Sequence, residues 1–145
     1  WFCFSCNKNT CDENPPSTIA SAAEIKVLQD FITANGIIAT QHASGFFYRI
    51  LTQGSGANPN QCSSITVRYK GTLLSGSTFD QSTTNVSFLL NQLIAGWKLG
   101  LPLLQKGGKI MLYIPPSLGY GSSSQSGIPA NSSLIFDIDL IGVEN

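Results

Sequence analysis

The chain has 145 residues, a length that usually makes one domain and can bury a sizeable core. Its 8 basic and 8 acidic side chains give a formal net charge of zero, and no basic run occurs, which argues against a nucleic-acid partner or a surface for anionic membranes. No apolar run reaches about 18 residues, so the sequence predicts no membrane-spanning helix.

Residues 1–16 are predicted to form a leader or tether, which begins apolar and turns polar at Asn7. One interpretation is the remnant of a secretory signal in which Cys6 is the lipid-modified first residue of a lipoprotein, so that the lipid tethers the chain to a membrane. A second interpretation takes Cys3 and Cys6 as a CxxC redox or metal pair, but His42 is the only histidine and zinc would need two further ligands. The tether is favoured, and its lipidation stays open.

Residues 17–44 are predicted to form an N-terminal helix and a linker. The stretch from Ser21 to Glu24 fits a capping box, and Gly36 suits the end of a helix. Five apolar residues recur at helical spacing: Ala23, Val27, Leu28, Phe31 and Ile32. The pattern favours a helix packed on its own domain over a docking or dimer helix. We expect this helix to be separable from the functional site, so that deletion of residues 1–36 leaves a folded domain.

From Ile37 onward the apolar period changes to two, which indicates short strands bounded by Gly, Ser, Asn and Pro. The predicted strands are 37–40, 45–53, 64–70, 108–114 and 133–143. Alternation turns Tyr69 and Phe136 inward among aliphatic neighbours. Four residues between the third and fourth strands recur at helical spacing: Ile94, Trp97, Leu101 and Leu104. Pro102 should end that helix early. The predicted class is α+β, an antiparallel sheet with one short helix against its inner face plus the N-terminal helix.

Ordinary catalytic machinery is missing from the sequence. Asp80 is the single acid between Asp30 and Asp137, which removes paired carboxylates from most of the chain. No histidine lies near Cys62, and neither a GxSxG motif nor a glycine-rich phosphate loop occurs. What remains is a set of aromatic residues with few polar groups, and for each ring taken singly core packing is the simpler interpretation. The set is Tyr69, Phe79, Asp80, Trp97, Tyr120 and Phe136.

Three stretches resemble successive blocks of FKBP-type peptidyl-prolyl isomerases: VRYKGTLLSGSTFDQS, LIAGWKLGLPLLQKGGKIMLYIPPSLGYG and GIPANSSLIFDIDLIGV. They occur in the family's order with suitable gaps, and the match runs over residues 45–143. The chain resembles a bacterial member with an N-terminal helical extension and an isomerase domain over residues 45–145. The resemblance implies a twisted antiparallel sheet of five or six strands wrapped around a short α-helix, with a ligand cup between helix and sheet.

The resemblance also implies which residues form the cup. Those with catalytic roles are Tyr69, Phe79, Asp80, Tyr120 and Phe136. Those that bind substrate are Leu93, Ile94, Trp97 and Ile128, with Trp97 as the floor. In the family the backbone N–H at Ile94 and the Tyr120 hydroxyl donate hydrogen bonds to ligand carbonyls, and Asp80 accepts one from Tyr69. No cofactor or metal is expected.

The implied activity is cis-trans isomerisation of X–Pro bonds in exported or envelope proteins. The partners would be proline-containing polypeptides, and macrolide-type ligands would fit the same cup. The sequence departs from the family pattern in three places: no Arg follows Phe79 and Asp80, Ser and Gln occupy the flap before Ile128, and Ala130 replaces a frequent Pro. The first two departures leave substrate preference and turnover open. The alternative is therefore a non-catalytic binding module or an accessory subunit of a cell-envelope complex.

The apolar start, and cysteines that fit no catalytic or metal pattern, indicate export. We therefore predict a bacterial cell-envelope protein, in the periplasm or associated with the outer membrane. Cys62 lies in a loop before a predicted strand, and Cys11 on the leader could reach it. A Cys11–Cys62 disulfide would close a loop of about 50 residues and contribute a few kcal/mol at most. The alternative is four free thiols in a cytosolic chain.

Overall fold

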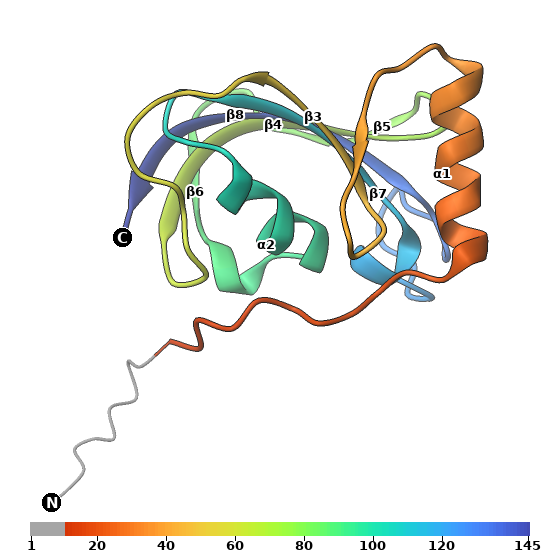
Figure 1. Ribbon diagram of the computed structural model, residues 1–145, viewed down its shortest axis with the longest axis horizontal. Coiled ribbons are helices and arrows are strands. Elements are labelled where there is room, and N and C mark those ends of the chain that lie inside the picture. The colour runs from red at the N-terminus through yellow and green to blue at the C-terminus, as the bar shows by residue number, and fades with distance from the viewer. Residues whose placement is uncertain (1–10) are drawn as a thin grey trace, which may run out of the picture.

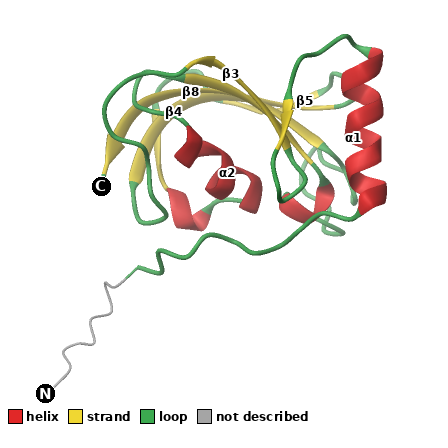
Figure 2. Cartoon of the chain, in the orientation of Figure 1, coloured by secondary structure: helices red, strands yellow, loops and turns green. Residues whose placement is uncertain are grey.

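The computed structural model describes residues 11–145 and confirms the α+β class. A strongly curved antiparallel sheet of seven strands wraps around a short helix, and a longer helix stands outside the sheet (Figures 1 and 2). In chain order the helices and strands are α1 (Ala22–Ala34), β2 (Thr40–Gln41), β3 (Phe47–Thr52), β4 (Ser64–Leu73), β5 (Thr78–Gln81), β6 (Val86–Leu89), α2 (Ala95–Gly100), β7 (Lys109–Ile114) and β8 (Leu134–Glu144).

Strand β4 is the centre of the sheet. The strands follow the order β2-β3-β7-β8-β4-β5, and β6 also pairs with β4. On one side β4 pairs with β8 along its whole length, so that Gly71 lies opposite Phe136 and Tyr69 lies opposite Ile138. On its other side the first half of β4 pairs with β6 and the second half with β5. Tyr69 and Phe136 are thus brought to the same inner face of the sheet.

The short helix α2 fills the concave side of the sheet (Figure 1). It begins after Ile94 and continues into a 3-10 turn at Leu101–Leu103 that contains Pro102, as the sequence predicts. Trp97 is 4% exposed, and Leu101 and Leu104 are fully buried. These side chains join the inward residues of β4, β7 and β8 in the main core. The core therefore holds α2, and with it Trp97, in one position.

Helix α1 packs on the outer side of the sheet and completes a second core. Leu28 and Ile32 of α1 are buried against Phe47 of β3 and Tyr113 of β7, which are themselves only 2% and 4% exposed. These contacts argue against the expectation that the helix is separable, because its deletion would uncover two large aromatic side chains. The prediction that Val27 packs in the apolar stripe is wrong, since 52% of this residue is exposed.

The capping box that begins α1 is confirmed. The Ser21 hydroxyl accepts a hydrogen bond from the Glu24 backbone N–H (3.2 Å), and the Ser21 N–H donates to the Glu24 carboxylate (3.0 Å). The strand predicted over 37–40 is wrong, because the Ile37 N–H still bonds to Ile32 at the end of the helix (3.0 Å). Only Thr40–Gln41 pairs as a strand there.

A disulfide joins the leader to the domain, and its partners are the pair named from the sequence. Cys11 and Cys62 are bonded across 51 residues, with their Cα atoms 5.7 Å apart. From Cys11 the leader runs beneath α2 toward the start of α1 (Figure 1). Cys3 and Cys6 lie outside the described residues, so the lipid and CxxC interpretations stay predictions. Among residues 11–145, no helix is long and apolar enough to cross a membrane.

Replacing Cys62 with serine is expected to lower the free energy of unfolding by about 2 to 4 kcal/mol, because the open chain regains the entropy of a loop of 51 residues. Urea unfolding with and without reductant measures this difference. Cys11→Ser is the matched variant and should lose the same amount. A reductant effect that persists in Cys62→Ser would contradict the assignment.

Candidate active site

An aromatic cup of about 220 Å³ opens between α2 and the inner face of the sheet. Its lining contains eight of the nine residues predicted as catalytic or substrate-binding, together with Phe88 and Gln92, which the sequence analysis missed. The complete lining is Tyr69, Phe79, Asp80, Phe88, Gln92, Leu93, Ile94, Trp97, Tyr120 and Phe136. Phe88 and Val86 both turn inward on β6, but a strand of four residues is too short for this alternation to be a clear signal in the sequence.

The rings of the cup support one another edge to face. Trp97 lies perpendicular to Phe136 (centroids 5.2 Å apart, 85°) and to Tyr69 (5.5 Å, 82°). Phe79 meets Phe136 in the same way (5.5 Å, 86°). Such T-shaped pairs are a preferred arrangement of aromatic rings. The floor and the walls of the cup are therefore fixed before any ligand arrives.

A bulge in β5 brings two consecutive residues to the same cup. Alternation along a strand would turn Phe79 and Asp80 to opposite faces. The register with β4 shifts here: Gly71 pairs with Asp80, and the next residue, Thr72, pairs with Thr78. Phe79 is thus the extra residue of a β-bulge, a device that redirects a side chain. Both residues consequently line the cup.

Gly71 of β4 leaves the space that the two phenylalanine rings occupy. A Cβ atom at this position would lie 2.6 Å from Phe79 and 2.9 Å from Phe136. Both distances are shorter than carbon atoms tolerate, so a larger residue would displace one of the rings. The importance of this glycine depends on the pairing of β4 with two other strands, so it was not visible in the sequence alone.

Asp80 at the rim is bonded to Tyr69, as the resemblance implies. The Tyr69 hydroxyl donates to Asp80 Oδ2 (2.7 Å), and the Gln81 N–H donates to Asp80 Oδ1 (2.9 Å). Burial, the hydrogen bond to Asp80 and the charge of Asp80 raise the pKa of Tyr69 to about 12. The phenol is therefore neutral throughout the physiological range and remains a donor.

Two further donors at the cup have no hydrogen-bond partner among residues 11–145. The backbone N–H of Ile94, at the start of α2, makes no hydrogen bond among the described residues. The hydroxyl of Tyr120 makes none either, and burial followed by the charge of Asp80 raises its pKa, so it too remains protonated. Both are the groups that the resemblance assigns to ligand carbonyls.

Ile128 does not line the cup, unlike the other eight predicted residues. It is 5% exposed and packs in the main core, held in a tight turn by paired backbone hydrogen bonds with Gln125 (2.9 Å each). A Cβ atom on the neighbouring Gly127 would lie 3.3 Å from Phe79. The turn thus lies against Phe79. A direct contact of Ile128 with substrate stays a prediction.

Among the described residues, no cluster of three or more His, Cys, Asp or Glu side chains could hold a metal ion. The model of the FKBP-type peptidyl-prolyl cis-trans isomerase family matches residues 56–141, more than half of the chain. This match agrees with the curved sheet, the enclosed helix and the aromatic cup. The chain belongs to this family.

Particular relatives are bacterial. The FKBP-type isomerase FkpA of Buchnera aphidicola is 46% identical over 121 residues, 81% of this chain and 49% of that protein. FkpA of Escherichia coli is 44% identical over 105 residues, 70% of this chain and 39% of that protein. The chain spans about half the length of the curated relatives it matches.

Solved structures of the family share the fold. The crystal structure of FkpA from Escherichia coli superposes on this chain with a TM-score of 0.76 at 38% identity. The superposition covers 85% of this chain and 58% of the FkpA chain. A peptidyl-prolyl cis-trans isomerase from Pseudomonas syringae superposes with a TM-score of 0.75 at 31% identity. This superposition covers 90% of this chain and all of the Pseudomonas chain.

Proposed function

We propose that this chain is a peptidyl-prolyl cis-trans isomerase whose active site is the aromatic cup, with residues 45–145 as the catalytic domain. The observation that carries the proposal is the cup itself, in which five aromatic rings surround one bonded pair of polar side chains, Tyr69 and Asp80. The family match over 56–141 lies within the proposed domain and supports the same activity.

The chemistry needs an apolar cup more than it needs a nucleophile. Rotation of an X–Pro amide is opposed by a barrier of about 18 to 20 kcal/mol, because resonance stiffens the C–N bond. The twisted amide loses this resonance, and its carbonyl depends less on solvation than that of the planar amide. A cup that removes water therefore favours the twisted state over the planar one. No group has to gain or lose a proton.

Each part of the cup has a separate task in this proposal. Trp97 and Phe136 enclose the proline ring. The Ile94 N–H and the Tyr120 hydroxyl donate to the carbonyls of the bound peptide, which fixes its orientation. Asp80 holds the Tyr69 ring in place and adds negative potential at the rim, where the twisting amide lies.

The proposed clients are proline-containing polypeptides of the bacterial cell envelope. The Cys11–Cys62 disulfide supports export, because such bonds persist in oxidising compartments such as the periplasm. The bacterial origin of the relatives supports the same setting. A lipid at Cys6 and membership of an envelope complex remain parts of this proposal, and macrolide-type ligands are proposed to occupy the same cup.

A protease-coupled assay on a tetrapeptide with a Leu-Pro or Phe-Pro bond tests the activity. Cis-to-trans conversion should accelerate in proportion to protein concentration, and a macrolide ligand should abolish the acceleration. A protein that binds the macrolide but leaves the conversion rate unchanged would contradict the isomerase proposal. It would instead support the non-catalytic binding module, which is the alternative.

Replacing Asp80 with alanine is expected to lower turnover about tenfold, which corresponds to about 1.4 kcal/mol of transition-state stabilisation. The residue is exposed at the rim, so the protein should fold normally. Asp80→Asn keeps an oxygen that can accept from Tyr69 and should lose less. Full turnover in Asp80→Ala would mean that Asp80 serves only the turn and has no role in isomerisation.

Turnover is expected to stay flat from about pH 6 to pH 9, because the mechanism transfers no proton. The pKa of Tyr69 is higher in the folded state than in the unfolded chain, so the neutral phenol contributes to the free energy of unfolding. This contribution is complete below pH 10.0 and is lost as the pH rises toward about 12. Unfolding measured across this alkaline range should show the loss, and Tyr69→Phe should remove it. A bell-shaped profile near neutrality would contradict the mechanism.

A further inference from the structure

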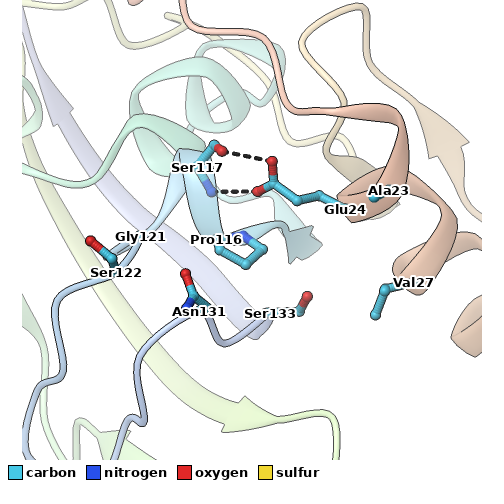
Figure 3. A pocket seen from close by; sticks show the side chains of 9 residues that line it. All are labelled: Ala23, Glu24, Val27, Pro116, Ser117, Gly121, Ser122, Asn131 and Ser133. Atoms are coloured by element: carbon cyan, nitrogen blue, oxygen red, sulfur yellow. Dashed lines mark hydrogen bonds between the residues drawn. The ribbon is translucent and has the colours of Figure 1, made fainter.

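A second cavity, of about 450 Å³, lies between α1 and the loops that flank the cup. We call it the α1 groove. It is lined by Ala23, Glu24, Val27, Pro116, Ser117, Gly121, Ser122, Asn131 and Ser133. Figure 3 shows residues of α1 on one side and residues of the segments after β7 and before β8 on the other. None of these nine residues lines the aromatic cup.

A carboxylate joins the two sides of the groove through hydrogen bonds. Glu24 Oε1 accepts from the Ser117 N–H (2.7 Å), and Oε2 accepts from the Ser117 hydroxyl (2.7 Å) (Figure 3). Oε2 also accepts from the Ser21 N–H and hydroxyl (3.0 and 2.9 Å). Glu24 is the only ionisable side chain of the lining, and its carboxylate already accepts four hydrogen bonds from neutral donors. Because the lining holds no cationic side chain, the groove suits a neutral ligand better than an anionic one.

The remaining lining combines apolar surface with polar groups that make no hydrogen bond within the described part of the chain. Ala23, Val27 and Pro116 form the apolar part, and Val27 is 52% exposed. Ser133 is 8% exposed as a residue, and its hydroxyl, which opens into the groove, makes no hydrogen bond within residues 11–145. Such a hydroxyl is free to donate to a ligand or to accept from one. The side chain of Asn131 is likewise unbonded in this part of the chain, and it can both donate and accept.

This combination matches an extended polypeptide. A peptide backbone offers alternating neutral donors and acceptors, and an uncharged side chain beside it offers apolar surface. The groove is also continuous with the cup along the chain, because Gly121 and Ser122 of the groove directly follow Tyr120 of the cup. A client held at the cup by its proline therefore has further chain close to the groove.

We infer that the α1 groove is a second polypeptide-binding site, which holds a neutral, extended segment of the client. An apolar client side chain packs on Val27 and Pro116, and the client backbone bonds to Ser133 and Asn131. The inference rests on the proposed action on polypeptides, but it assigns binding to residues that take no part in isomerisation. Clients longer than the cup consequently gain affinity that short peptides do not.

A titration of a neutral, proline-free peptide rich in Leu and Ser tests the groove alone. The ¹⁵N-labelled protein is first saturated with a macrolide, so that the cup is closed. The amide signals of Val27, Ser122 and Ser133 should shift as the peptide is added. Val27→Gln should weaken binding about tenfold, as expected when apolar contact is lost. Ile38→Gln is the matched control, because Ile38 is a 78% exposed residue outside the groove.

Asn131 allows a second variant that should not disturb folding. Its φ of +59° is a conformation that glycine adopts freely, so Asn131→Gly removes the amide and keeps the backbone. This variant should also weaken the peptide. Unshifted groove signals, or affinities of Val27→Gln and Asn131→Gly equal to that of the unaltered protein, would overturn the inference.

Isomerase activity on a long client tests the α1 groove independently of the peptide titration. Val27→Gln should lower kcat/KM about fivefold for a full-length client whose refolding waits on proline isomerisation, and leave tetrapeptide turnover unchanged. Equal kcat/KM values for the long client would count against the groove. An unaltered protein without tetrapeptide turnover would instead contradict the proposed function, whereas the peptide titration would still decide on the groove.

Discussion

Replacing Trp97 with alanine is expected to lower the free energy of unfolding by about 3 to 5 kcal/mol, because the indole fills the space between α2 and the sheet. The side chain is 4% exposed and contacts Tyr69 and Phe136 edge to face. Turnover per folded molecule should also fall by about tenfold or more, since the floor of the cup is lost. Denaturant unfolding and the protease-coupled assay measure the two effects.

Trp97→Phe is the control for this experiment, because it keeps an aromatic floor and removes less volume. It should lose clearly less stability and retain measurable turnover. An alanine variant within about 1 kcal/mol of the unaltered protein would show that α2 can close over the cavity. That result would contradict the view that the core fixes the cup in advance.

Replacing Leu28 with alanine is expected to cost about 2 to 5 kcal/mol of stability, because this fully buried side chain joins α1 to the sheet. Leu28 does not line the cup, so turnover per folded molecule should be unchanged. Thermal or urea unfolding measures the loss. Deleting residues 1–36 should have a larger effect, since it also exposes Phe47 and Tyr113 and removes the disulfide.

Val27 provides the matched control on the same helix. It is the neighbour of Leu28 but is 52% exposed, so Val27→Ala should change stability by no more than about 0.5 kcal/mol. Similar losses for the two variants would mean that the helix acts through its own stability instead of through the second core. A stable, active protein without residues 1–36 would restore the expectation that the helix is separable.

The sequence was most informative where the pattern is local or repeated. The capping box at Ser21 and Glu24 depends on residues three apart, and the inward direction of Tyr69 and Phe136 depends on strict alternation within their strands. The end of α2 follows from the fixed backbone of Pro102. The cup itself came from the family resemblance, because its residues lie on several elements that only the fold brings together.

Other features depend on pairing between distant segments, and the sequence could not supply them. Strands β5 and β6 are four residues each and too short to show a clear period. The bulge at Phe79 exists only in the register between β4 and β5. Periodicity also cannot tell which part of a helical stripe meets the sheet, so it grouped exposed Val27 with buried Leu28.

The disulfide also decides how the molecule responds to mechanical pull. Tension applied to the chain ahead of Cys11 passes through the sulfur atoms to Cys62, two residues before the central strand β4. The segment between them, which includes α1, β2 and β3, lies outside this path and bears no tension. A force on the leader is therefore delivered to the longest strand pair of the sheet, β4 with β8, while α1 stays outside the loaded path. Reduction of the bond would reroute the same force through α1 first.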